Sequence, residues 1–147
     1  MSNHKVAILM GSASDLPVME AAGDVLNELG IGWRMAVRSA HRTPEETVAY
    51  VRKAEEDGVQ VLICGAGMAA HLAGVVAAES LLPVIGVPIN ASLDGMDALL
   101  ATVQMPPGIP VATVAIGNAA NAGLLALQIL AISDPPLREQ LHRYRQG

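Results

Sequence analysis

The sequence predicts an α/β protein, with a three-layer α/β/α fold around a five-stranded parallel sheet, formed by one domain over residues 1–147. Short apolar runs rich in β-branched residues alternate with longer helical patterns along the whole chain. Strands that alternate with helices in this way form a parallel sheet whose two faces are both covered. The 147 residues are enough for one sizeable core, and neither an internal repeat nor a linker divides the chain.

The first strand is expected over residues 6–10, because this continuous apolar run is typical of a buried strand. A helix is expected over residues 16–29, because Gly30 follows it and glycine commonly ends helices. Residues 31–37 alternate only partly between apolar and polar side chains, which favours a strand at the edge of the sheet.

The next helix, over residues 44–57, also ends at a glycine, Gly58, and carries most of the charge in its region. An apolar run over residues 59–64 predicts the third strand, and a helix over residues 68–81 follows it. Residues 84–87 form a short apolar run that predicts the fourth strand.

The last third of the chain predicts a helix over residues 93–104, and then a strand over residues 111–115 after a proline-rich loop. An apolar helix is expected over residues 118–132. Two prolines then begin a charged tail helix over about residues 135–146.

Composition narrows the class of protein. Hydrophobic residues make up 52% of the chain and charged residues 16%, while the aromatic residues are only Trp33, Tyr50 and Tyr144. The formal net charge of −5 and the lack of a basic stripe argue against nucleic acid as a partner. The single cysteine, Cys64, lies in a predicted buried strand, which suits a reducing compartment. Residues 1–5 are polar, so we expect no signal peptide.

No charged residue occurs between Ala98 and Ser133. Prolines and amides interrupt this stretch, so it does not reach the roughly 18 apolar residues of a membrane span. The helix predicted at residues 118–132 is apolar on nearly every face and needs cover on two sides. The sheet can cover one side, and we expect a second subunit to cover the other, which predicts a homo-oligomer.

The most informative segment is residues 39–44, which set a hydroxyl, an imidazole and a guanidinium just ahead of a predicted helix. Thr43 and Glu46 fit a capping box. The N–H groups and dipole of a helix N-terminus suit an anion, most often phosphate, and His41 beside it would be placed to move protons. The alternative is that the segment only caps the helix while His41 and Arg42 are solvated.

A second segment, residues 11–15, connects the first strand to the first helix with small and hydroxyl-bearing residues. Backbone N–H groups and the hydroxyls of Ser12 and Ser14 can surround a phosphate or a sugar there. Asp15 would repel a phosphate, but it can accept hydrogen bonds from the two hydroxyls of a ribose. Alternatively, Ser14 or Asp15 is an ordinary N-cap, although capping and ligand binding can coexist in one loop.

A third segment, residues 65–74, is rich in glycine and alanine and follows the third strand. It matches the glycine-rich dinucleotide fingerprint only superficially, because no carboxylate appears until Asp94, beyond the end of the next strand. We expect a turn of small residues that lets a flat ligand approach the backbone, with His71 one helical turn further on. Taken alone, such a histidine is more often a core group than a catalytic one.

All three segments follow strands of the predicted parallel sheet. In such sheets ligands bind outside the carboxyl ends of the strands, where the strand order reverses. We therefore expect the three segments to converge at one edge of the sheet and to form a single site for a small ligand.

Together these segments closely resemble the PurE family, and the match runs in the same order from Val6 to about Leu130. The matching motifs are residues 10–15, 39–44, 65–72, 83–88, 103–106, 110–117 and 121–130. Residues 97–106 resemble class I of the family, the mutases, rather than class II, the carboxylases that use CO2. The loops at residues 90–93 and 118–121 look slightly shortened against the family.

The resemblance implies a flavodoxin-like, doubly wound sheet and a cytoplasmic homo-octamer that acts in de novo purine biosynthesis. It implies conversion of N5-carboxyaminoimidazole ribonucleotide to 4-carboxy-5-aminoimidazole ribonucleotide, with no cofactor and no metal ion. The expected partner is therefore a small ribonucleotide substrate, and neither nucleic acid nor a membrane.

The resemblance also implies residue roles. Substrate binding would fall to residues from all three segments: Ser12, Ser14, Asp15, Ser39, Arg42, Gly67, Met68, Ala70 and Leu72. Among them, Ser14, Ser39 and Arg42 would hold the phosphate. His41 and His71 would be the catalytic residues, with His41 as the proton shuttle.

The chemistry can be placed on these residues as a hypothesis. Protonation at or near the carbamate nitrogen releases CO2, recapture at C4 forms a carbon–carbon bond, and a base then removes the C4 proton. The CO2 must be trapped, which requires a small, dry pocket such as the glycine- and alanine-rich segment can line. His41 could act first as the acid and then as the base, and a protonated His71 could neutralise the migrating carboxylate.

Three alternatives remain open from the sequence. A class II-type carboxylase would use free CO2 and the unsubstituted aminoimidazole with the same residues. A flavin-binding electron carrier on the same sheet would need an aromatic ring to stack on the flavin, for which only Trp33 and Tyr50 are near. A non-catalytic nucleotide-binding module would need no positioned histidine.

Overall fold

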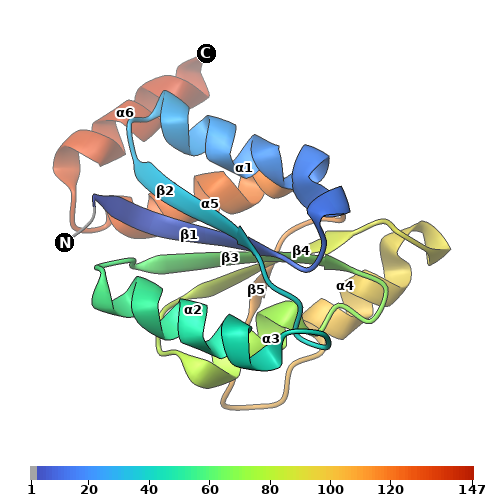
Figure 1. Cartoon of the computed structure of the whole chain (residues 1–147). Coiled ribbons are helices and arrows are strands. Elements are labelled where there is room, and N and C mark those ends of the chain that lie inside the picture. The colour runs from blue at the N-terminus through green and yellow to red at the C-terminus, as the bar shows by residue number, and fades with distance from the viewer. Residues whose placement is uncertain (1–2) are drawn as a thin grey trace.

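A computed structural model describes residues 3–147, so Met1 and Ser2, the start of the polar segment noted above, lie outside the described residues. Five parallel strands form one sheet in the order β2-β1-β3-β4-β5 (Figure 1). They are β1 (His4–Met10), β2 (Gly32–Val37), β3 (Val61–Gly67), β4 (Val84–Ile89) and β5 (Ala112–Thr113). The strand order reverses between β1 and β3, as in a doubly wound sheet of the flavodoxin type.

Helices cover both faces of the sheet (Figure 1). They are α1 (Leu16–Glu28), α2 (Pro44–Glu56), α3 (Leu72–Glu79), α4 (Met96–Val103), α5 (Ala119–Ala131) and α6 (Pro135–Gln146). Helices α1 and α5 lie on one face, α2, α3 and α4 lie on the other, and α6 packs on the outside of α5. The predicted three-layer α/β/α fold is therefore confirmed.

Strand β1 shows why its sequence is continuously apolar. Val6, Ile8 and Met10 join the core with α1 and α5, whereas Ala7 and Leu9 join the core with α2 and α3. Because both faces of a central parallel strand are covered, neither set of alternating side chains reaches solvent. The partly alternating β2 pairs only with β1, so the predicted edge position is also confirmed.

Helix α5, which carries no charge, is covered largely within the chain. It packs against α1 so closely that a Cβ on Gly123 would lie 2.8 Å from the Ala22 carbonyl oxygen. On the outside, α6 adds Leu137, whose side chain is buried in the same core. Ile132, just beyond the helix, remains 82% exposed. No helix within residues 3–147 has the length and apolar character that crossing a bilayer requires.

Several boundaries differ from those expected. Strand β3 runs on to Gly67, and α3 starts only at Leu72, because Met68 has left-handed backbone (φ 56°) that fits neither element. The helix expected over residues 93–104 is a 3-10 turn (Leu93–Gly95) followed by α4. Strand β5 is reduced to two residues, the only ones that pair with β4.

Candidate active site

The carboxyl ends of β2, β1 and β3 are joined by backbone hydrogen bonds just beyond the strands. The Arg38 N–H donates to the Met10 carbonyl (2.8 Å), and the Gly11 N–H donates to the Gly65 carbonyl (3.1 Å). The loops after these three strands therefore leave the sheet at one edge, which we call the carboxyl rim (residues 11–15, 38–43 and 67–71). All three segments selected from the sequence lie there.

Two histidines meet at the carboxyl rim. His41 Nε2 and His71 Nδ1 are 2.8 Å apart, within hydrogen-bond distance. The two rings pack edge to face, with centroids 4.9 Å apart and an angle of 84° between their planes. Such a bond needs one N–H and one lone pair, so the two bonded nitrogens cannot both carry a proton. The pair lies at an exposed position, and two imidazoles in this contact can share a proton.

The backbone brings the histidines together from two different loops. His41 lies in the turn between β2 and α2, and His71 is the N-cap residue of α3 without a side-chain cap bond. The sequence placed His71 one turn inside a helix, and that expectation is wrong because α3 begins one residue after it. Directly before the helix, its ring is free to reach His41.

The loop of residues 39–43 is held by hydrogen bonds among its own hydroxyls. The Arg42 N–H donates to Ser39 Oγ (3.0 Å), and the Ser39 N–H donates to Thr43 Oγ1 (3.0 Å). Because Thr43 Oγ1 also donates to the Ser39 carbonyl (3.2 Å), it makes no cap bond to α2. The predicted start of α2 is right, but the predicted capping box with Glu46 is wrong. The guanidinium of Arg42 remains exposed.

The loop after β1 forms a short 3-10 turn over residues 13–15. Ser12 Oγ lies 2.9 Å from Ser14 Oγ, and the Ser14 N–H donates to Ser12 Oγ (3.3 Å). Asp15 occupies the N-cap position of α1, as the alternative interpretation expected, but its side chain makes no cap hydrogen bond. Burial raises the pKa of its carboxyl, and a hydrogen bond from the Ser12 backbone partly offsets this effect.

Residues 67–72 contribute mainly backbone. Met68 is 59% exposed, whereas the side chains of Ala70 and Leu72 are buried in the protein. Tight turns connect them: the Ala70 N–H donates to the Met68 carbonyl (2.9 Å), and the His71 N–H donates to the Ala69 carbonyl (2.8 Å). Neither Ala70 nor Leu72 therefore presents its side chain to a ligand, whereas Met68 and His71 on the same segment are exposed.

The loop after β4 also belongs to this edge, and the sequence analysis above does not select it. A Cβ on Gly67 would lie 2.8 Å from the Cβ of Ala91, so this loop presses against the end of β3. The signal was available, because residues 90–95 follow a parallel strand as the other three segments do. The loop carries neither a histidine nor an arginine, so its side chains alone do not indicate a site.

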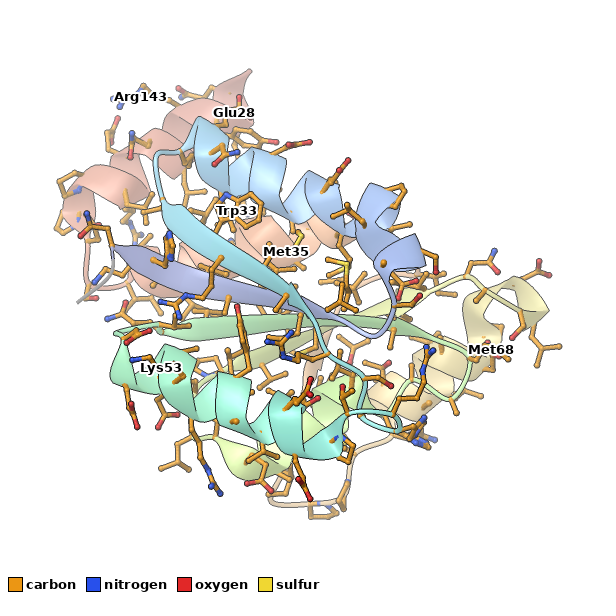
Figure 2. All side chains as sticks on the ribbon, in the orientation of Figure 1. Glu28, Trp33, Met35, Lys53, Met68 and Arg143 are labelled. Carbon is orange, nitrogen blue, oxygen red and sulfur yellow. The ribbon has the colours of Figure 1, made fainter. Side chains whose placement is uncertain are left out.

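Two hollows of the surface lie elsewhere. One, of about 630 Å³, lies between α5 and α6, and another, of about 640 Å³, lies between α1 and α6. Figure 2 shows Glu28 and Arg143, which line the second, at the opposite end of the molecule from Met68. None of the predicted site residues lines either hollow. The paired histidines, rather than the size of a cavity, identify the candidate active site.

The lone cysteine takes no part in this site. Cys64 is buried in β3, and burial raises the pKa of its thiol, which keeps it neutral and unreactive. Within residues 3–147, no three side chains of histidine, cysteine, aspartate or glutamate gather as a metal ion would require.

The chain is similar in sequence and in structure to known proteins. Residues 5–147 match the family described as "AIR carboxylase". The N5-carboxyaminoimidazole ribonucleotide mutase of Pyrococcus horikoshii is 58% identical over 140 residues, covering 95% of this chain and 79% of that protein. The chloroplastic phosphoribosylaminoimidazole carboxylase of Vigna aconitifolia is 50% identical over 142 residues, 96% of this chain but 26% of that protein. The crystal structure of Treponema denticola PurE superposes with a TM-score of 0.88 at 31% identity, covering 96% of this chain and 89% of that one.

Proposed function

The chain belongs to the AIR carboxylase family, and from this membership we propose that it is a mutase of de novo purine biosynthesis. In the proposed reaction it converts N5-carboxyaminoimidazole ribonucleotide to 4-carboxy-5-aminoimidazole ribonucleotide. The carboxylate leaves the exocyclic nitrogen and joins ring carbon C4 of the same molecule, so the enzyme is an isomerase and consumes no second substrate.

The observation that carries the proposal is the hydrogen bond between His41 and His71 at the carboxyl rim. The reaction needs a proton delivered to the nitrogen when its bond to carbon breaks, and a proton removed from C4 after the new carbon–carbon bond forms. One imidazole can do both, as acid and then as base. His41 takes this role, and His71, its hydrogen-bond partner, supplies or withdraws the proton and faces the migrating carboxylate.

The loops on either side suit the rest of a ribonucleotide. Ser12 and Ser14 bond to one another, which uses one hydroxyl proton and leaves the other for a phosphate oxygen. The exposed guanidinium of Arg42 and the start of α2 add positive charge for the phosphate. Ser39 orders this loop, and the half-buried carboxylate of Asp15 would accept from the ribose hydroxyls.

The third loop suits the heterocycle and the CO2 released from it. The segment from Gly67 to Ala70 carries small residues except at Met68, whose apolar side chain is exposed. Leu72 supports this segment from the core. A pocket lined by backbone and apolar side chains excludes water, which favours recapture of CO2 over its loss.

A carboxylase that uses free CO2 is the second candidate, and the relative named as a carboxylase favours it. The flavin alternative loses support, because Trp33 is occupied elsewhere. Its Nε1 donates to Asn27 Oδ1 (2.8 Å), and its ring fills the space left open by Gly23 under α1. The ring of Tyr50 lies beneath the Arg38 guanidinium, 5.0 Å from its centre, and is not an open stacking surface.

Assembly and location form part of the same proposal. Helix α4 and the turn before it expose large apolar side chains, namely Leu93, Met96, Leu100 and Val103. Exposed apolar area of this kind marks interaction surfaces. We assign it to contacts between copies in a homo-octamer that acts in the cytoplasm, with neither nucleic acid nor a membrane as partner and no cofactor.

The test supplies the carbamate ribonucleotide and the unsubstituted aminoimidazole ribonucleotide with bicarbonate in separate assays, and follows the carboxylated product by absorbance. A mutase uses the carbamate rapidly and retains an isotope label in its carboxylate when unlabelled CO2 is present. Rapid use of the unsubstituted compound instead would identify a carboxylase. Turnover of neither compound would overturn both candidates.

A further inference from the structure

The loop between β4 and α4 has a backbone that is unfavourable for residues with side chains. Leu93 (φ 48°) and Asp94 (φ 55°) are both left-handed, and Gly95 (φ 84°) continues the same conformation. Within residues 3–147, the only other non-glycine residue with positive φ is Met68. Strands β3 and β4 are paired neighbours, so all of these residues lie at one part of the sheet edge. Such conformations persist only where surrounding contacts hold them, and they gather at functional sites.

The loop is wedged between two parts of the fold. On the side of β3 it approaches Gly67, where a Cβ would lie 2.8 Å from the Cβ of Ala91. On the side of β5 it approaches Ile116, where a Cβ on Gly95 would lie 2.5 Å from Cγ2. Ala91, at the start of this loop, therefore lies beside Gly67, from which the backbone leads to Met68 and His71.

Asp97, in the first turn of α4, ties this loop down. The Ser92 hydroxyl donates to Asp97 Oδ2, and the Ala98 N–H donates to Asp97 Oδ1 (2.8 Å). The Gly95 N–H closes the turn by donating to the Ser92 carbonyl (2.8 Å). Both carboxylate oxygens are thus engaged between the loop and the helix, and the helix N-terminus favours the negative charge.

From these contacts we infer that residues 91–95 are a fourth wall of the active site, and that Asp97 is its positioning residue, acting through Ser92. The inference rests on the proposed function. In that reaction CO2 is unbound between cleavage of its bond to nitrogen and attack by C4. A wall beside Gly67 keeps it near C4. Without the tie, the loop relaxes toward ordinary backbone and CO2 escapes, leaving the aminoimidazole ribonucleotide with the proton on its nitrogen.

The experiment measures how the enzyme partitions its substrate. Wild type and variants receive the carbamate ribonucleotide, and the ratio of aminoimidazole ribonucleotide to carboxylated product is corrected for spontaneous decomposition. Ser92→Ala removes one hydroxyl, and Asp97→Ala removes both acceptors. Each is expected to raise the ratio roughly tenfold or more, as small displacements near a reacting centre do, with little change in KM. Ser92→Thr keeps the hydroxyl, so its ratio is expected to stay at the wild-type value.

Asp134→Ala is the matched control. Asp134 accepts from the Leu137 N–H (3.2 Å) at the start of α6, far from the carboxyl rim, so its loss removes a helix cap without touching the loop. Its ratio is expected to stay at the wild-type value. An inactive wild type would overturn the proposed function. An active wild type, with unchanged ratios in Ser92→Ala and Asp97→Ala or an equal rise in Asp134→Ala, would overturn this inference.

Discussion

His41 Nε2 and His71 Nδ1 lie 2.8 Å apart although their loops follow strands that are not neighbours. Strand β1 separates β2 from β3, so the two side chains meet across the end of β1. This contact joins the loop assigned to the phosphate with the loop assigned to the heterocycle. In the proposed reaction, a proton held between the rings serves the heterocycle and its exocyclic nitrogen.

Replacing His41 with asparagine tests the proton shuttle. Asparagine keeps a polar side chain of similar size but cannot exchange a proton at neutral pH. We expect kcat to fall about 10²- to 10⁴-fold, the usual contribution of general acid–base catalysis, while ribonucleotide binding and assembly are retained. Steady-state kinetics, equilibrium binding and a measurement of molar mass give the three values. His142→Asn on the exposed face of α6 serves as the control. Near-normal turnover of His41→Asn would remove His41 from the mechanism.

A double-mutant cycle with His71→Asn tests whether the two histidines act as one unit. If the proton moves between them, the double variant should lose little more activity than His41→Asn alone, because residues that act together are not additive. Losses that multiply in full would mean that the histidines work independently, and the relay would be wrong.

Asp15→Asn should separate stability from binding. Burial raises the pKa of Asp15 above 3.8 in the folded state. The stabilisation that follows from a raised pKa is present below about 3.8 and lost as the pH rises through the folded-state pKa. At neutral pH the ionised carboxylate therefore costs stability, and its neutral isostere should not lower the urea midpoint. Ribonucleotide binding should weaken roughly tenfold to a hundredfold, as for a hydrogen bond to a charged group. Lower stability with unchanged affinity would contradict this role.

Asp57→Asn should make the free energy of unfolding depend less on pH in the acid range. The Arg34 hydrogen bond (3.0 Å), and after it the Lys53 contact (3.1 Å), hold the pKa of Asp57 below 3.8. The resulting stabilisation is present above 3.8 and lost as the pH falls through the folded-state pKa. Urea midpoints measured across pH should show wild type above the variant at neutral pH, with the two converging in acid. The control Glu139→Gln, from an exposed pair with Arg143, should shift them less. A gap that persists in acid would count against the ion pair.

Gly123→Ala tests the close crossing of α1 and α5. In an open helix this change usually stabilises by about 0.5–1 kcal/mol. Here the new methyl would meet the backbone oxygen of Ala22 at 2.8 Å, so we expect a loss of about 1–3 kcal/mol instead. Gly74→Ala in α3 is the comparison, because its nearest neighbour is the flexible end of Met105 at 3.0 Å. Urea unfolding measures the stability of both variants. Equal losses would contradict the close packing of α1 against α5 at Gly123.

Local signals predicted most of the fold. Helices α1 and α2 end two residues before Gly30 (φ 74°) and Gly58 (φ 97°), whose left-handed backbones follow the C-cap residues. Strand β3 runs past the predicted end because Ala66 and Gly67 pair with β4, although neither residue favours strands by itself. Pairing with a neighbouring strand overrides intrinsic preference, and a sequence pattern does not contain it.

The topology of the sheet was enough to predict where the three segments meet, but not the contacts between their side chains. Each selected segment follows a parallel strand, so the general rule for such sheets brought them to one edge. The bond between His41 and His71 was not predictable, because it depends on a left-handed turn at Met68 that delays α3. The capping box failed for a similar reason, since the hydroxyl of Thr43 is already engaged with Ser39.

The most direct test of the account is a crystal structure of the assembled protein with the carboxylated ribonucleotide bound. The expected complex has its phosphate at Ser39 and Arg42 before α2, its ribose at Asp15, and its heterocycle within hydrogen-bond reach of His41. A ribonucleotide seated between α5 and α6, or held at the carboxyl rim with His41 turned away, would contradict the account.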